Sequence, residues 1–111
     1  MLFIDEDNNI KLTRGDTATL TLTVSKDGES YDYSNDLTQF TVKRNTVTAD
    51  IILQKTFVGD TIIINPEDTK DLYYVDLVYD VQLITPGGEV HTVIEPRIFE
   101  ITQEVNFNVN R

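Results

Sequence analysis

Residues 11–24 read KLTRGDTATLTLTV, and the second half of this stretch decides the fold class. From Ala18 to Val24, apolar residues alternate with threonines. Because successive side chains of a β-strand point to opposite faces of its sheet, the alternation predicts a strand with one buried and one solvated face. Threonine suits the solvated face, since it is polar and its β-branch tolerates a pleated backbone. The stretch therefore predicts an antiparallel sheet with a core on one side.

The tripeptide Arg14-Gly15-Asp16 precedes that strand, and cell-adhesion ligands use the same three residues to engage integrins. A glycine permits positive φ, so we interpret Gly15 as a bulge or kink between a short strand ending at Thr13 and the strand beginning at Ala18. We expect Arg14 and Asp16 to face solvent or to pair with each other. Integrin recognition would require a projecting loop in an extracellular protein, and the sequence indicates neither.

Turn-forming residues divide the rest of the chain into further short strands. Asp27-Gly28 predicts a tight hairpin turn, and residues 86–89 (PGGE) predict a second hairpin loop. Pro96 predicts a break in the last strand, because a proline within a sheet is confined to an edge or a bulge. The expected strands after residue 24 cover residues 39–43, 51–57, 61–65, 73–83, 90–94 and 98–101, of which 73–83 is the longest.

One short helical turn is expected near residues 66–71. Asn65 suits the N-cap and Pro66 the first helical position. Glu67, Asp68 and Asp71 are best explained by the positive end of this turn, which favours acidic side chains.

About seven strands, no long amphipathic helix and a helical turn before a tyrosine-bearing strand predict the fold class. We expect an all-β fold, an immunoglobulin-like two-sheet antiparallel β-sandwich that forms a single domain over residues 1–111. The predicted core comprises Leu20, Leu22, Phe40, Val42, Leu53, Ile63, Leu77, Tyr79, Val81 and Phe99.

The charge balance narrows the range of partners. The chain of 111 residues has 19 Asp and Glu against 9 Lys and Arg, a formal net charge of −10. Nucleic acids and anionic membrane surfaces require a basic patch, and the densest basic group here is Lys43-Arg44. We therefore expect no nucleic-acid partner and no membrane partner.

The N-terminal residues and the absence of cysteine bear on where the protein is made. The start, MLFIDEDNN, has no basic segment followed by a long apolar run, so no signal peptide is expected. No stretch approaches the roughly 20 apolar residues that a membrane-spanning helix needs. The chain contains no cysteine, which removes disulfides and the usual argument for secretion. Synthesis in a cytoplasm is the expectation.

Catalytic residues are scarce in this sequence. His91 is the single histidine, and its position in a predicted strand favours a surface strand residue. The serines lie in or beside turns, so nothing indicates a converging Ser/His/Asp set. We predict no enzyme, no catalytic or metal-binding residues and no cofactor.

The stretch Asp5-Glu6-Asp7-Asn8-Asn9 is the densest group of oxygen ligands in the chain. Calcium takes six to eight oxygens from such groups, but this stretch lacks the spacing and glycine of an EF-hand loop. A solvated polar segment explains it as well, and the sequence leaves both readings open.

Residues 1–9 and 104–111 are predicted extensions or edge strands of the domain. In the second segment Val105, Phe107 and Val109 alternate with asparagines, which is typical of a strand. Such a strand either completes the domain's own sheet or forms an oligomer edge that pairs with a neighbouring subunit.

An ordered series of short motifs is similar to that of a known family. The motifs are IKLTRGDTATL at residues 10–20, YD at 31–32, FTVK at 40–43, ILQK at 52–55, PEDT at 66–69 and YDVQL at 79–83. In this order they resemble the N-terminal domain of the baseplate upper protein of phages that infect Gram-positive bacteria, and related short prophage tail and baseplate proteins. The resemblance covers roughly residues 10–102.

The resemblance implies a non-enzymatic structural or assembly protein with an immunoglobulin-like β-sandwich. Its expected location is the virion, and its expected partners are other tail or baseplate proteins or further copies of itself in a homo-oligomer. An adhesion or receptor-binding module for host-surface carbohydrate or protein is the alternative, since such sandwiches commonly present binding loops. The strong acidity also leaves open an inhibitor or regulator of a host protein.

Overall fold

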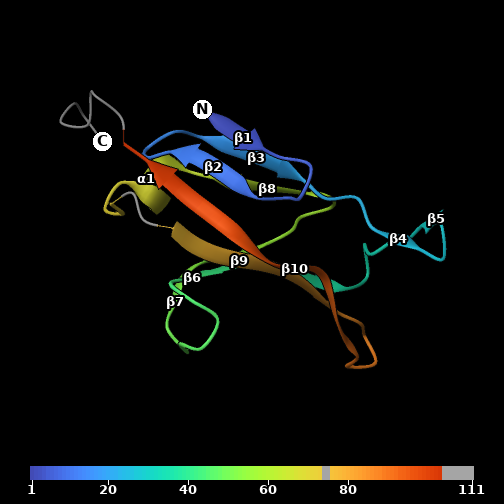
Figure 1. The fold of residues 1–111 in the computed structure, drawn as a ribbon. Coiled ribbons are helices and arrows are strands. Elements are labelled where there is room, and N and C mark those ends of the chain that lie inside the picture. The colour runs from blue at the N-terminus through green and yellow to red at the C-terminus, as the bar shows by residue number, and fades with distance from the viewer. Residues whose placement is uncertain (74–75, 104–111) are drawn as a thin grey trace.

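The computed structural model describes residues 1–73 and 76–103, which form ten strands and one short helix. The prediction of an all-β fold is confirmed. Six strands form a large sheet in the order β1-β2-β10-β9-β6-β7 (Figure 1). These strands are β1 (Leu2–Ile4), β2 (Ile10–Thr13), β6 (Leu37–Lys43), β7 (Ile51–Thr56), β9 (Asp76–Ile84) and β10 (Val90–Thr102).

A small sheet of two strands packs its buried side chains into the same core. It pairs β3 (Ala18–Thr21) with β8 (Thr61–Ile64) in antiparallel register. Between β3 and β6 the chain forms a hairpin from β4 (Ser25–Lys26) and β5 (Glu29–Ser30). Its turn residues Asp27 and Gly28 have φ of 53° and 83°, the double positive φ of a type I′ turn. The hairpin predicted from Asp27-Gly28 is therefore confirmed.

The predicted antiparallel arrangement is wrong for one pair of strands. β2 and β10 run parallel, with Ile10 opposite Phe99 and Leu12 opposite Ile101. Parallel neighbours need a long connection between them, and here the rest of the domain supplies it. Local alternation could not reveal this pairing, because it joins the two ends of the described chain.

The last strand, β10, is the longest with 13 residues, so the prediction that residues 73–83 form the longest strand is wrong. Pro96 lies where the pairing of β10 with β9 changes register, between Ile94 and Arg97. The register change places the proline at a bulge, as predicted, and the strand continues on both sides of it. Tyr73 precedes β9 and is 73% exposed, whereas the sequence pattern placed it on the inward face of that strand.

The helix α1 (Pro66–Thr69) lies within the predicted helical turn. The backbone N–H of Asn65 donates to Asp68 Oδ2 at 2.7 Å, and the N–H of Asp68 donates to the Asn65 carbonyl at 3.0 Å. Asp68 also forms an ion pair with Lys55 of β7, with 2.8 Å between Oδ2 and Nζ. These contacts fix α1 against the inner side of the large sheet.

Three aromatic rings form the centre of the core. The ring centroid of Phe40 lies 5.0 Å from that of Tyr79 and 5.8 Å from that of Phe99. Burial confirms eight of the predicted core residues, and Leu53 is half-buried against them. The confirmed residues are Leu20, Leu22, Phe40, Val42, Leu77, Tyr79, Val81 and Phe99.

Ile63 is the predicted core residue that is wrong, since it is 50% exposed while Ile62 and Ile64 are buried. Three consecutive isoleucines do not alternate with polar residues, so the sequence alone does not show which of them face the core. The pairing with β3 decides their orientation, because it sets Ile62 opposite Leu20 and Ile64 opposite Ala18.

Truncation of neighbouring isoleucines tests this orientation. We expect Ile62→Ala to lower the free energy of unfolding by about 2–4 kcal/mol, because it leaves a cavity in the core. Ile63→Ala should lower it by less than about 1 kcal/mol, as at an exposed site. Urea denaturation of both variants measures the difference, and equal losses would contradict the orientation of β8.

Tyr79 joins the core to the N-terminal segment, since its hydroxyl donates to the Asn8 carbonyl. Burial raises the pKa of Tyr79 to about 12. An unfolded tyrosine ionises near pH 10, so between about pH 10 and 12 the unfolded state loses its proton first. The stabilisation that the protonated Tyr79 contributes to the folded state is complete below pH 10 and is lost as the pH rises from about 10 to 12.

Tyr79→Phe should therefore cost about 1 kcal/mol at pH 8, from the lost hydrogen bond, and less at pH 11. The variant's free energy of unfolding should decline less steeply than that of the unchanged chain over the alkaline window. Urea denaturation at the two pH values measures this, and parallel declines would show that Tyr79 ionises normally.

Candidate interaction surface

The large sheet has an inner face, on which the small sheet and α1 pack, and an outer face. In the described residues, the outer face is left uncovered by any second layer of strands or helix. Its side chains are those that alternate with the core residues along β6, β7, β9 and β10. They are Leu37, Gln39, Thr41 and Lys43, then Ile51, Gln54 and Thr56, then Asp76, Val78, Asp80, Gln82 and Ile84, then Val90, Thr92, Ile98 and Glu100.

Cross-strand register sorts these side chains into rows that run across the strands. The row nearest the β9–β10 hairpin contains Leu37, Ile84 and Val90, and we call it the hairpin row. The row nearest the loop between β6 and β7 contains Ile51, Lys43, Val78 and Ile98, and we call it the loop row. Both rows are mainly apolar and partly solvent-exposed, with Val90 56% and Ile51 51% exposed.

Two rows of polar side chains lie between the apolar ones. Gln54 Nε2 donates to Thr41 Oγ1 at 3.0 Å, and Gln82 Nε2 donates to Thr92 Oγ1 at 3.1 Å. These hydrogen bonds hold the amide side chains along the sheet surface, where cross-strand pairs stabilise each other. The middle of the outer face is therefore polar, ordered and mostly uncharged.

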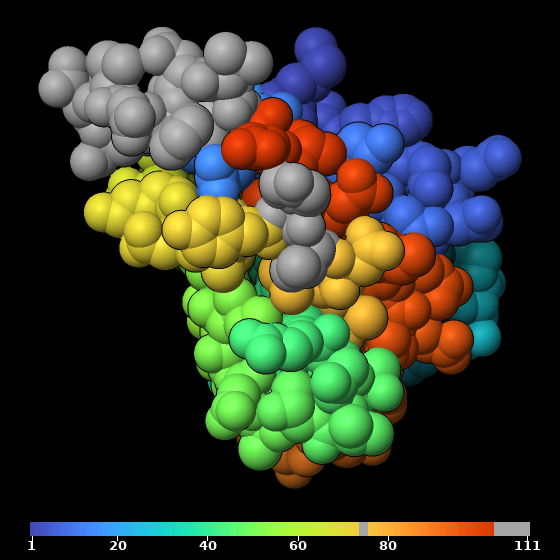
Figure 2. Space-filling view, turned by 60° about the vertical axis from the view of Figure 1, so that its left-hand side comes forward, coloured from blue at the N-terminus to red at the C-terminus, as the bar shows by residue number. Residues whose placement is uncertain are grey.

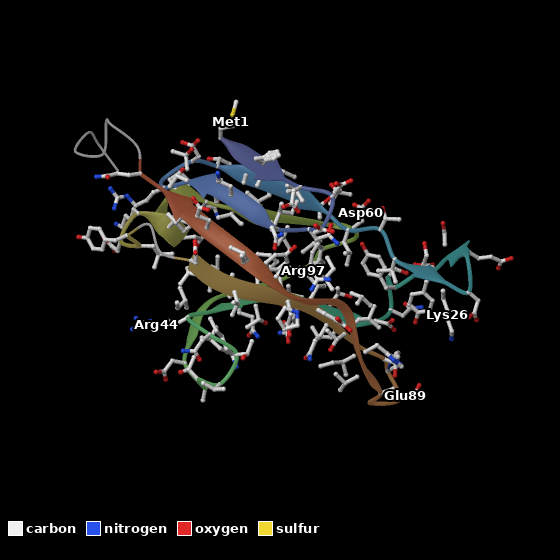
Figure 3. The ribbon with its side chains drawn as sticks, in the orientation of Figure 1. Met1, Lys26, Arg44, Asp60, Glu89 and Arg97 are labelled. Atoms are coloured by element: carbon white, nitrogen blue, oxygen red, sulfur yellow. The ribbon has the colours of Figure 1, made fainter. Side chains whose placement is uncertain are left out.

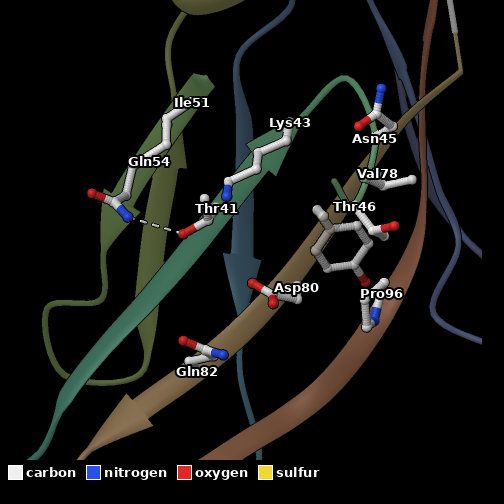
Figure 4. A pocket seen from close by; sticks show the side chains of 11 residues that line it. Thr41, Lys43, Asn45, Thr46, Ile51, Gln54, Val78, Asp80, Gln82 and Pro96 are labelled. Carbon is white, nitrogen blue, oxygen red and sulfur yellow. Dashed lines mark hydrogen bonds between the residues drawn. The ribbon is translucent and has the colours of Figure 1, made fainter. Parts of the chain in front are cut away.

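A hollow of about 280 Å³ opens over the loop row (Figure 4). Asn45 and Thr46, from the loop between β6 and β7, form one wall, and Pro96 lies on another side. The same loop stands at one end of the molecule in the space-filling view, in green (Figure 2). Asp80 projects into this hollow, and burial raises its pKa, with the nearby Lys43 partly opposing the shift.

Charge is sparse in the middle of this surface, where Asp80 is the charged side chain of the two polar rows. The other charged residues among those named above are Lys43 in the loop row and the facing pair Asp76 and Glu100, which lies beyond the loop row. Depletion of charge at the centre, with apolar side chains nearby, is typical of protein–protein interfaces. The outer face is the strongest candidate for such an interface in the described part of the chain.

The edge strands of the large sheet, β1 and β7, by contrast, have features that disfavour pairing with another chain. β7 has a register shift opposite Val42 and Lys43, and its inward-facing Lys55 is paired with Asp68. At the opposite edge β1 has only three residues. Bulges, inward charges and short strands are the means by which proteins prevent edge-to-edge pairing.

In the Arg14-Gly15-Asp16 corner, Arg14 is buried, whereas Gly15 and Asp16 are partly exposed. The Arg14 side chain is 3% exposed, and its guanidinium donates to the Leu72 carbonyl at 3.2 Å and stacks on Tyr73 at 5.3 Å. The expectation that Arg14 faces solvent or pairs with Asp16 is therefore wrong. Gly15 has φ of +81°, which agrees with the predicted kink.

The other predicted site residues fall in separate places. Asp5 accepts hydrogen bonds from the N–H groups of Asp7 and Asn9, each at 2.9 Å, and the bonds from Asn9 lower the pKa of Asp5. Within residues 1–73 and 76–103 no three His, Cys, Asp or Glu side chains are grouped so as to hold a metal ion. His91 is an exposed strand residue. Val105, Phe107 and Val109 lie outside the described residues.

A second hollow of about 290 Å³ lies between the two hairpins. Lys26 and Glu89 mark these hairpins, which lie away from Arg44 (Figure 3). Tyr31 and His91 line the hollow, and the Tyr31 hydroxyl donates to Asp36 at 2.7 Å. This arrangement offers one aromatic ring and several polar groups to a small ligand.

Comparison with known proteins gives this chain no relatives: no family model, curated protein or solved structure matches it. No helix in the described residues is long and apolar enough to cross a membrane. The functional reading therefore rests on the surface itself and on the motif series.

Neutralising Asp80 tests the environment of the outer face. Because its folded pKa is raised, the charged form destabilises the folded protein, and this destabilisation grows as the pH rises from about 4 through the folded pKa. We expect Asp80→Asn to melt at a higher temperature than the unchanged chain at pH 7, in dilute protein. At pH 3 the two should melt alike. Calorimetry at both pH values measures this, and a variant that is less stable at pH 7 would contradict it.

Proposed function

We propose that this chain is a non-enzymatic structural protein that acts through protein–protein contacts. The observation that carries the proposal is the outer face of the large sheet, which combines exposed apolar rows with a charge-poor polar centre. A monomeric protein rarely exposes a contiguous surface of this kind without a partner for it.

Within the all-β class, we propose that the fold is an immunoglobulin-like sandwich. The order β10-β9-β6-β7 corresponds to strands G, F, C and C′ of a variable-type domain, and the β3–β8 pair corresponds to B and E. The helix α1 lies in the connection that corresponds to the E–F corner. The hairpin β4–β5 is then an insertion between B and C.

The particle in which the protein works is proposed to be a phage tail or baseplate, with the virion as its location. The motive is the ordered motif series over residues 10–102, whose members resemble the baseplate upper protein family. The motif at residues 10–20 forms β2, the Gly15 kink and the start of β3, so it includes the corner between the sheets. Other tail proteins or further copies of this chain are the proposed partners.

Antibody labelling of induced phage particles tests the proposal directly. We expect label at a fixed position on the tail or baseplate of every particle. Particles of a deletion mutant that lack the protein serve as the control for antibody specificity. Unlabelled particles, together with normal infection by the deletion mutant, would rule out a structural role.

An adhesion or receptor-binding module is the second candidate, favoured by the hollow between the two hairpins. Aromatic side chains beside polar groups can bind a sugar ring, and Tyr31 lies there with His91. Purified bacterial cell-wall polysaccharide should then bind the protein, and Tyr31→Ala should weaken binding at least about tenfold. Equal binding by the variant would exclude this hollow.

A further inference from the structure

We propose that the outer face of the large sheet binds the same face of a second copy of this chain, so that two sheets pack face to face around a two-fold axis. The inference rests on the proposed assembly function and names its surface and its partner. In a two-fold interface the same patch is used by both copies, so that patch must be complementary to itself. The outer face meets this condition in its pattern, its charge and its size.

The pattern of the rows is symmetric about the middle of the face. From the hairpin row to the loop row the four rows read apolar, polar, polar, apolar, and the acidic pair Asp76 and Glu100 lies beyond the loop row. A two-fold axis along the middle, parallel to the rows, places the hairpin row of each copy over the loop row of the other. Ile84 then faces Val78 of the second copy, and Val90 faces Ile98 of the second copy. The hollow over the loop row provides space for the incoming side chains.

The same arrangement provides hydrogen-bond donors for Asp80. No hydrogen bond or ion pair joins its carboxylate to the residues that the structure describes, although Lys43 lies near enough to influence it. The axis places Gln82 of the second copy opposite Asp80. Gln82 donates to Thr92 within its own chain, and its amide nitrogen has a second N–H available to donate to the carboxylate.

The sparse charge of the four rows permits self-association through the middle of this face. Two copies with a net charge of −10 each repel one another, so they associate only where acidic side chains are sparse. Within the four rows, from the hairpin row to the loop row, Lys43 and Asp80 cancel each other. Elsewhere Asp5, Asp60 and Glu67, on the N-terminal loop, the β7–β8 turn and α1, carry negative charge on the surfaces around it.

The size of the face suffices for a stable dimer. Strands about 4.8 Å apart and residues about 3.3 Å long make β10, β9, β6 and β7 a patch roughly 20 Å on each side. The accessible area of such a patch, with its side chains, is of the order of the 800 Å² per partner that standard interfaces bury. Face-to-face packing of two sheets at about 10 Å is a common arrangement.

Sedimentation equilibrium of the full chain, from micromolar to near-millimolar concentration, tests the proposal. We expect a reversible monomer–dimer equilibrium. Ile98→Lys should raise the dissociation constant at least about tenfold, because a two-fold interface buries the introduced charge twice. Ile63→Lys is the matched control, since Ile63 is an equally exposed isoleucine in a strand of the small sheet, and it should leave the constant unchanged.

Cross-linking tests the register, and the chain suits it because it contains no cysteine. A mixture of the Gln82→Cys and Asp80→Cys variants should join rapidly through a short bis-maleimide, whereas Ile63→Cys alone should not. Circular dichroism confirms that each variant is folded. A folded chain that remains monomeric throughout the concentration range, or equal weakening by Ile98→Lys and Ile63→Lys, would overturn the proposal. Labelled phage particles built with a monomeric protein would keep the assembly function and reject this interface.

Discussion

The whole structure depends on one constraint: within residues 14–17 the chain must leave the large sheet and enter the small one. Gly15 makes the change of direction through its positive φ, and its N–H donates to Thr69 Oγ1 at 2.8 Å. The backbone N–H of Arg14 donates to the Thr102 carbonyl at 2.8 Å, while its side chain reaches the Leu72 carbonyl. One corner thus ties together β2, β3, the segment after α1 and the end of β10. The tripeptide resembles an adhesion signal, but its arginine is a buried structural residue.

This corner also determines which surface is left for association. Because β3 and β8 both lie on the inner side of the large sheet, all four strands from β10 to β7 present their second face to solvent. The strand edges are shortened, bulged or charged, so extension of the sheet from its side is disfavoured. The proposed association therefore uses the face of the sheet, and the net charge of −10 favours its middle rows, where acidic side chains are sparse.

Period-2 alternation predicted the parts of the fold that local geometry decides. It placed Leu20, Phe40 and Tyr79 in the core, and the Asp27-Gly28 turn and the helical turn after Asn65 followed from backbone preferences. It failed at Ile63, because three isoleucines in a row show no alternation. It also failed at Arg14, because the Leu72 carbonyl, distant in sequence, accepts a hydrogen bond from this side chain, which is of a type normally found at the surface. The outward residues Gln39, Thr41, Gln82 and Asp80 could be read from the same alternation. That their face is the uncovered one depends on the order of the strands, which the alternation does not contain.

The parallel pairing of β2 with β10 determines when the large sheet can form during synthesis. Residues 10–13 find their partners at residues 99–102, so the loop that must close contains almost the whole described chain. Such distant contacts make folding slow, since the entropy of closing the loop is lost before the contacts form. During synthesis, β2 and β3 leave the ribosome before their partner strands, β10 and β8, have been translated. The large sheet can therefore be completed only after β10 has been translated.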